Sequence, residues 1–191
     1  MLASFDTYAT AETAESLPPF AEVIETHKGM VYSIAWHFLR DRPAAEELAQ
    51  EVFLQLHRSW SSMKSADHIV FWLRKVASHR AIDHARRLKR RPETSLEEAA
   101  EPTTLERVHD TFLSTYLARI VASLPEKQRM VVILRYQEEM EVEEISKALN
   151  LKAATVKTLL ARAIDLLRTK AERRLGRVED RSQAARAGTE L

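Results

Sequence analysis

Hydrophobic residues recur at helical spacing in three segments between residues 124 and 168. The first segment follows Pro125, the second covers residues 142–149, and the third begins near residue 154. Ser123 and Glu126 stand three residues apart, as in a capping box, and so predict the start of the first helix. The third segment places one apolar row on a single face: Val156, Leu160, Ala163 and Leu167. A short helix, a brief turn and a longer helix predict a helix-turn-helix.

The opposite face of the third segment is basic, with small residues between the charges. At about 100° per residue, that face carries Lys157, Thr158, Ala161 and Arg162. Side chains of these types read base edges in a DNA major groove, which admits one helix. Residues 152–174 hold seven Lys or Arg residues against two acidic ones, so the segment also attracts phosphate. The pattern indicates a DNA-reading helix, and the alternative is an amphipathic core helix with a solvated basic face.

The same periodicity predicts three helices in the first half of the chain. The first covers residues 20–39, and Pro43 opens the second. The exposed side of the second helix is acidic and amide-bearing: Glu46, Glu47, Gln50 and Glu51. A polar loop then leads to a third helix, which begins near Ile69 and becomes strongly basic toward Arg91. The 191 residues include only three glycines, so an all-α fold is expected.

Breaks in the periodicity divide the chain into two small helical domains, residues 20–91 and 111–175. A flexible linker, residues 92–110, is expected between them because it is rich in Glu and contains two prolines. Within it, Thr103 and Glu106 have the spacing to cap a helix that leads into the second domain. A flexible leader is expected at residues 1–19 and a polar tail at residues 176–191.

Charge is distributed in blocks, although the net charge is only +1. Residues 71–91 contain eight Lys or Arg residues against one acidic residue. Residues 1–26 contain five acidic residues and no Lys or Arg, and residues 138–144 form a further acidic patch. Such blocks predict separate basic surfaces with acidic segments between or over them.

Composition excludes several other classes of protein. Without cysteine, the chain has no disulfide, no thiol catalysis and no cysteine-based zinc site. The seven histidines are scattered without metal-ligand spacing, and neither a nucleophile–base pair nor a glycine-rich phosphate loop is present. We therefore expect no enzyme, no metal and no cofactor. No signal peptide or membrane-span pattern occurs, so a cytoplasmic location is expected.

Four segments together resemble one known family. They are AAEELAQEVFLQLHRSW (44–60), FWLRKVASHRAIDHARR (71–87), LPEKQRMVVILRY (124–136) and EEISKALNLKAATVKTLLARAIDLL (143–167). In this order, with this linker, they resemble the bacterial extracytoplasmic-function (ECF, group IV) RNA polymerase sigma factors. The resemblance covers roughly residues 20–170. It implies a region 2 domain and a region 4 helix-turn-helix domain that direct core RNA polymerase to promoter DNA.

The resemblance also implies roles for particular residues. The positions that would dock on the polymerase clamp are Glu46, Glu47, Gln50, Glu51 and Phe53. The positions that would open and hold the minus-ten element are Arg74, Lys75, His79, Arg80, Asp83, Arg86 and Arg87. The positions that would read the minus-thirty-five element are Lys157, Thr158, Ala161 and Arg162. Trp72 is expected in the core rather than as a base contact. The alternative for the acidic helix is a solvated face.

Three positions depart from the family pattern. His79 stands where the family commonly has Asn, Asn150 where it has Gly, and Leu159 where it has Arg. Asn tolerates the left-handed backbone that such a turn needs. Leu159 removes an expected phosphate contact. Lys152 occupies the cap position of the recognition helix, where Ser or Thr is usual.

Two questions of partnership stay open at the level of sequence. Family members are often held inactive by an anti-sigma factor, so the resemblance implies such a partner as an option; no small-molecule substrate is expected. The competing function is a helix-turn-helix regulator that binds an operator without polymerase. It would leave the acidic helix and the basic helix at 71–91 without a role.

Overall fold

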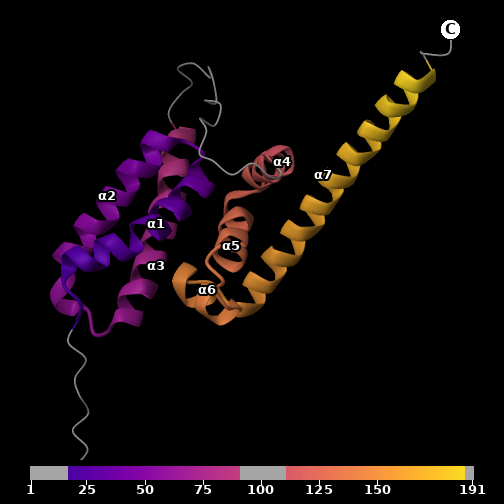
Figure 1. The fold of residues 1–191 in the computed structure, drawn as a ribbon. Helices are drawn as coiled ribbons and strands as arrows, with labels where there is room; N and C mark the ends of the chain where they lie inside the picture. Colours follow the sequence, from indigo (N-terminus) through magenta and orange to yellow (C-terminus); the bar gives the residue numbers. More distant parts are fainter. Residues whose placement is uncertain (1–16, 91–110, 188–191) are drawn as a thin grey trace, which may run out of the picture.

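The structure, a computed structural model, describes residues 17–90 and 111–187, with side chains at 17–90 and 116–173. Within these ranges it contains helices and turns and no strand, which confirms the all-α prediction (Figure 1). The first unit comprises α1 (Phe20–Leu39), α2 (Arg42–Arg58), the short 3₁₀ helix η1 (Trp60–Ser62) and α3 (Ala66–Arg90). The second comprises α4 (Thr111–Ala122), α5 (Glu126–Tyr136), α6 (Val142–Leu149) and α7 (Ala153–Ala187).

The break between α1 and α2 follows from local chemistry. Arg40 takes the left-handed conformation, with φ of 58°, and its N–H bonds to the Trp36 carbonyl to close α1. The Asp41 carboxylate accepts a hydrogen bond from the Ala44 N–H at 2.9 Å and caps α2, with Pro43 in the first turn. The two helices therefore fold back on each other, and both pack on α3.

The second unit contains the helix-turn-helix, with different caps from those expected. The prediction of a capping box between Ser123 and Glu126 is wrong. The Ser123 hydroxyl donates to the Ile120 carbonyl, and α5 begins after Pro125 without a side-chain cap. The capping box occurs at α6 instead, between Glu141 and Glu144. Asn150 is left-handed at φ 52° and ends α6, as its residue type predicts.

The C-terminal helix is longer than the sequence pattern indicated. Its backbone continues as helix through Ala187, beyond the expected boundary at residue 175, and its end extends away from the other helices in Figure 1. Residues 1–16 of the expected leader, the whole expected linker (92–110) and the Thr103–Glu106 cap lie outside the described residues.

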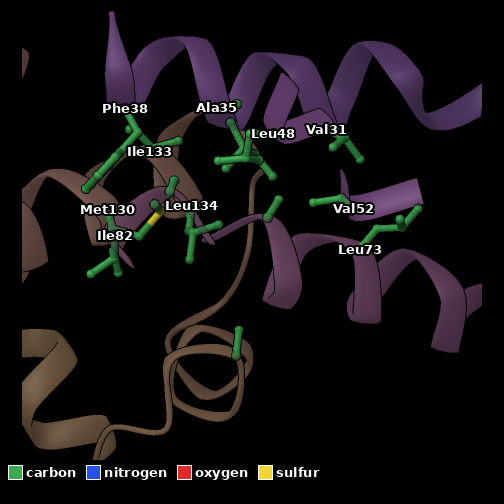
Figure 2. Packing of buried hydrophobic residues seen from close by; sticks show 14 of the residues in the cluster. Val31, Ala35, Phe38, Leu48, Val52, Leu73, Ile82, Met130, Ile133 and Leu134 are labelled. Carbon is green, nitrogen blue, oxygen red and sulfur yellow. The ribbon is translucent and has the colours of Figure 1, made fainter. Parts of the chain in front are cut away.

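The two units pack against each other. Helix α1 contacts α4 and α5, and α3 contacts α5 and α6. A single cluster of buried hydrophobic residues runs through both units: Met130, Ile133 and Leu134 of α5 belong to it together with Phe38 of α1 and Ile82 of α3 (Figure 2). A smaller cluster around Leu124, Val132 and Ala163 holds α7 to α5.

Candidate nucleic-acid interface

The basic face expected on the recognition helix is exposed on α7. Lys157, Thr158, Ala161 and Arg162 are all solvent-exposed, whereas Val156 and Ala163 on the opposite side are fully buried. The Thr158 hydroxyl donates to the Ala154 carbonyl at 2.9 Å, within the helix. Among the described residues, neither Lys157 nor Arg162 forms an ion pair. Their charges are therefore available to an external partner.

Leu159 and Leu160 lie on the side of α7 that packs inward. Both are partly buried against the main hydrophobic cluster, and Leu160 also contacts the smaller one. Leu159 thus takes part in packing. The first turn of α7 is closed by backbone bonds from the Thr155 and Val156 N–H groups to the Lys152 carbonyl, at 2.8 and 3.1 Å. The first turn of α7 is therefore hydrogen-bonded, although Lys152 stands where a Ser or Thr cap is usual.

The acidic residues of α2 have different surroundings. Glu46 pairs with Arg42 at 2.9 Å on the surface, and Glu47 and Gln50 are exposed. Glu51 pairs with Arg80 of α3 at 2.6 Å. Phe53 is only 9% exposed and belongs to the main cluster, so its side chain packs α2 onto the bundle and offers little surface to a partner.

The basic helix α3 uses two of its sides for packing. Toward α2, the Arg80 guanidinium donates to Gln55 at 2.8 Å in addition to its ion pair with Glu51, so Arg80 ties α3 to α2. Trp72 is half-buried against the main cluster, in agreement with its expected core position. Lys75 and Arg87 are exposed, and Asp83 lies 3.6 Å from Arg86 on the surface.

Three of the residues expected to hold the minus-ten element contact the second unit. Arg74 Nε lies 3.3 Å from the Glu138 carboxylate, and His79 Nε2 lies 2.9 Å from the Ala148 carbonyl at the end of α6. Arg86 lies 3.7 Å from Glu126, which also accepts a hydrogen bond from Lys89 at 2.6 Å.

The environment of these ion pairs shifts several pKa values. Burial raises the pKa of Glu138, and the nearby Arg74 guanidinium opposes that rise. The hydrogen bond from Lys89 lowers the pKa of Glu126. Burial, with a smaller contribution from Arg74, also lowers the pKa of His27. Glu138 is thus a buried carboxyl whose cost of desolvation is only partly offset by its partner.

Sequence reasoning missed Arg129 as a connecting residue. Its guanidinium donates to the Phe38 carbonyl at 2.8 Å and to the Leu124 carbonyl at 3.2 Å, and also to the Ala122 carbonyl. The same group lies 5.2 Å from the centre of the Phe38 ring. Burial lowers the pKa of Arg129. Arg129 therefore joins the last carbonyls of α1 and α4, which its sequence position alone did not indicate.

An apolar groove lies where α1, α4, α5 and α7 meet. Its volume is about 690 Å³, and its lining includes Leu117, Tyr136 and Ile164, all of them exposed hydrophobic residues. Arg40, which follows α1, and Arg168 of α7 also line it. Because both units contribute walls, the groove exists in this form only while the units are packed together.

Two further features concern other kinds of site. No helix in the described part of the chain is both long enough and apolar enough to cross a membrane. Within those same residues, no three His, Asp or Glu side chains are grouped in a way that could hold a metal ion.

A helix-turn-helix with an exposed basic face, beside a helical bundle with its own charged surfaces, is typical of a DNA-binding protein. The family profile for sigma-70 region 2 matches residues 23–91, and that for sigma-70 region 4 matches residues 114–167. An RNA polymerase sigma-E factor of Streptomyces avermitilis is 31% identical over 157 residues, covering 81% of this chain and 86% of the relative. The chain belongs to the sigma-70 family of RNA polymerase sigma factors, which direct the polymerase to promoters.

Other similar proteins agree with this membership. The ECF RNA polymerase sigma factor SigW of Bacillus subtilis is 27% identical over 164 residues, covering 78% of this chain and 87% of its own. The fold is similar to that of sigma factor RpoE of Bartonella quintana, solved in complex with the anti-sigma factor NepR. That comparison gives a TM-score of 0.68 at 16% identity and covers 80% of this chain and 96% of the other. CnrH, solved with the cytosolic domain of CnrY, gives a TM-score of 0.57, also at 16% identity.

Proposed function

We propose that this chain is a group IV, extracytoplasmic-function sigma factor that acts in the cytoplasm by binding, while the polymerase carries out catalysis. Residues 20–91 would serve as region 2 and residues 111–175 as region 4. The observation that carries the proposal is the exposed face of α7, where Lys157 and Arg162 project opposite the buried Val156 and Ala163. A helix anchored on one side and cationic on the other fits a major groove.

Region 4 would read the minus-thirty-five element through this face. Arg162 is the residue we assign to a base edge, because Arg binds guanine through two hydrogen bonds. Lys157 is assigned to phosphate or an adjacent base. The small side chains of Thr158 and Ala161, between the two cations, leave room for the helix to approach the DNA closely. Leu159, partly buried, leaves region 4 with one fewer phosphate contact than the family pattern would give.

Region 2 would contact both polymerase and the minus-ten element. On α2, the exposed Glu46, Glu47 and Gln50 supply acidic and amide groups for the clamp. On α3, Lys75 and Arg87 are exposed cations that suit the single strand of an opened promoter. Arg74, His79 and Arg86 would join them when they are released from the second unit. Arg80 and Glu51 would act mainly by holding α3 against α2, because they pair with each other.

An anti-sigma factor is the further partner we propose. The sigma factor RpoE, which has a similar fold, was solved in complex with the anti-sigma factor NepR. In this chain, the apolar groove between the units has exposed hydrophobic residues and cationic Arg40 and Arg168 in its walls. That combination suits an amphipathic helix with acidic flanks. Its binding would hold the two units together.

The experiment that tests the proposed function is selection from a randomised DNA library by the full chain, with and without core polymerase. A sigma factor should enrich two separated elements, and only when core is present. Strong enrichment of a single element by the chain alone would favour the operator-binding regulator. Because the library is random, the selection itself yields the sequences of the elements.

A further inference from the structure

We propose that the apolar groove where α1, α4, α5 and α7 meet is a binding site for a fatty acid, which the chain binds and does not transform. The ligand carboxylate would lie at Arg40 and Arg168, and its aliphatic chain would lie along Leu117, Tyr136 and Ile164. The inference goes beyond the proposed sigma function, because it gives the chain a small-molecule site of its own.

The walls of the groove concentrate apolar surface that the fold leaves open. Six large hydrophobic residues are exposed among the described side chains, and three of them line this groove: Leu117, Tyr136 and Ile164. Its volume of about 690 Å³ lies within the range of roughly 300–1,000 Å³ that small-molecule sites occupy. Apolar surface gathered in a hollow of this size indicates a ligand with an apolar body.

The character of the lining favours an aliphatic body over an aromatic one. The described lining consists mainly of Leu, Ile, Val and Ala side chains, and Tyr136 is the single Phe, Tyr or Trp among them. An aromatic ligand gains most from stacked or edge-to-face contacts with other rings, which this lining offers at one residue only. A flexible alkyl chain needs no such partner and gains from each methylene group that it buries.

The charged groups at the groove are cations. Arg40 and Arg168 both line it, and neither forms an ion pair with another described residue. No Asp or Glu occurs among the described residues of the lining. Apolar walls with positive charge and no counter-charge suit a ligand that joins an alkyl chain to an anion, and a carboxylate matches the planar guanidinium.

Arg40 is held in position by the protein itself. Its guanidinium carbon lies 4.9 Å from the centre of the Trp36 ring, in a cation–π contact. Burial lowers the pKa of Arg40, which means that its charge is partly desolvated. The neighbouring His37 supplies no negative charge, and its own pKa is lowered by burial and by Arg40. A ligand carboxylate would compensate the desolvated guanidinium.

Occupation of the groove would affect regulation. The groove is also the place where we propose that a helix of an anti-sigma factor binds, and the two occupants would overlap there. A fatty acid would therefore compete with that helix and favour the free sigma factor. This consequence rests on the proposed function, whereas binding of the fatty acid is measured on the chain alone.

Equilibrium dialysis of the full-length chain against radiolabelled decanoate, kept below its micelle-forming concentration, measures this binding. Decanol and decyltrimethylammonium, tested as competitors, carry the same alkyl chain with a neutral and a cationic head group. We expect decanoate to bind about fivefold more tightly than decanol, the upper range for an exposed charge contact, and the cation to bind most weakly. Octanoate, which lacks two methylene groups, should bind roughly tenfold more weakly than decanoate.

Two pairs of variants locate the ligand. Leu117→Glu brings a carboxylate into the groove and should weaken decanoate binding about tenfold or more by like-charge repulsion. Leu54→Glu makes the same change at an exposed leucine outside the groove and should bind normally. Arg168→Gln should weaken decanoate binding roughly threefold and leave decanol binding unchanged. Arg173→Gln, at an exposed residue of α7 outside the lining, should change neither. Circular dichroism checks that each variant keeps its helix content.

Three results would overturn the inference. Absence of saturable decanoate binding would show that the groove takes no fatty acid. Equal affinities for decanoate and decanol would mean that the arginines do not bind the carboxylate. Equal binding by Leu117→Glu and Leu54→Glu would place the ligand outside the groove. None of these measurements contains polymerase or promoter DNA, so their failure is distinct from a failure of library selection with core.

Discussion

Arg162 shows how a single residue can be tested apart from the fold. It is exposed on α7 and has no ion-pair partner among the described residues. Arg162→Ala should weaken promoter binding by about 1–3 kcal/mol and relax preference at one or two base pairs. Arg173→Ala, on the same helix and also exposed, is the control for loss of charge and should leave the preferred sequence unchanged. A promoter library bound with core polymerase measures both. If Arg162→Ala keeps affinity and preference, another side of α7 faces the groove.

Glu138 gives the folded chain a characteristic dependence on pH. Because burial raises its pKa, the folded chain holds this proton more readily than the unfolded chain, where the pKa is about 4.3. Its favourable contribution to the free energy of unfolding is therefore complete below about pH 4.3 and is lost as the pH rises through the folded value. The contribution of Glu126 to the free energy of unfolding depends on pH in the opposite direction. Its pKa is lowered in the folded chain, so this contribution is lost as the pH falls.

Urea unfolding at a series of pH values checks this. The free energy of unfolding of wild type minus that of Glu138→Gln should decrease as the pH rises from about 4 to about 7. The same difference for Glu126→Gln should decrease instead as the pH is lowered below about 4.3. A Glu138→Gln difference that is flat with pH would mean that this carboxyl is not desolvated in solution.

At the scale of elements, the turn between α6 and α7 depends on the backbone of Asn150. Its φ of 52° lets the N–H groups of Asn150 and Leu151 both bond to the Ser146 carbonyl. Asn150→Ala should lower the free energy of unfolding by about 1 kcal/mol, because a Cβ without a local polar group disfavours this conformation. Asn150→Gly should be neutral or stabilising. Urea unfolding of the two variants compares them directly, and equal losses would show that the side chain of Asn150 matters more than its backbone.

Helix α2 carries the surface assigned to polymerase. Glu51 is a poor site for a test because it pairs with Arg80, but Glu47 is exposed and forms no ion pair among the described residues. Glu47→Lys should weaken binding to core polymerase roughly fivefold, since an exposed charge contact is worth up to about 1 kcal/mol. Glu22→Lys on α1 makes the same charge change elsewhere and should bind normally. Equilibrium binding of each variant to core polymerase at moderate salt tests this assignment. If Glu47→Lys and Glu22→Lys bind core equally well, Glu47 does not contact the clamp.

Periodicity predicted the helices well because it is local information. The span of α1 and the breaks at Pro43 and Asn150 follow from residues within one or two turns. The cap expected at Ser123 failed because its hydroxyl bonds backward to Ile120, a choice that spacing alone does not fix. The exposed face of α7 was predictable from its amphipathic pattern, whereas Phe53 was placed on the polymerase surface and lies in the core.

At the scale of the whole molecule, the packing of one unit on the other was beyond the sequence pattern. The contacts join residues far apart in the chain, such as Arg74 with Glu138 and His79 with Ala148. No local period encodes such pairs, because they depend on how two finished bundles meet. The blocks of charge seen in the sequence did indicate basic surfaces with acidic segments over them, and Glu138 belongs to one such acidic patch.

Run-off transcription with purified core polymerase tests the central claim most directly. The template carries the two elements enriched by library selection, and the reaction is run with and without the full chain. We expect a transcript of defined length that requires the chain and disappears when either element is scrambled. A chain that binds this template but yields no more transcript than core alone would contradict a sigma function.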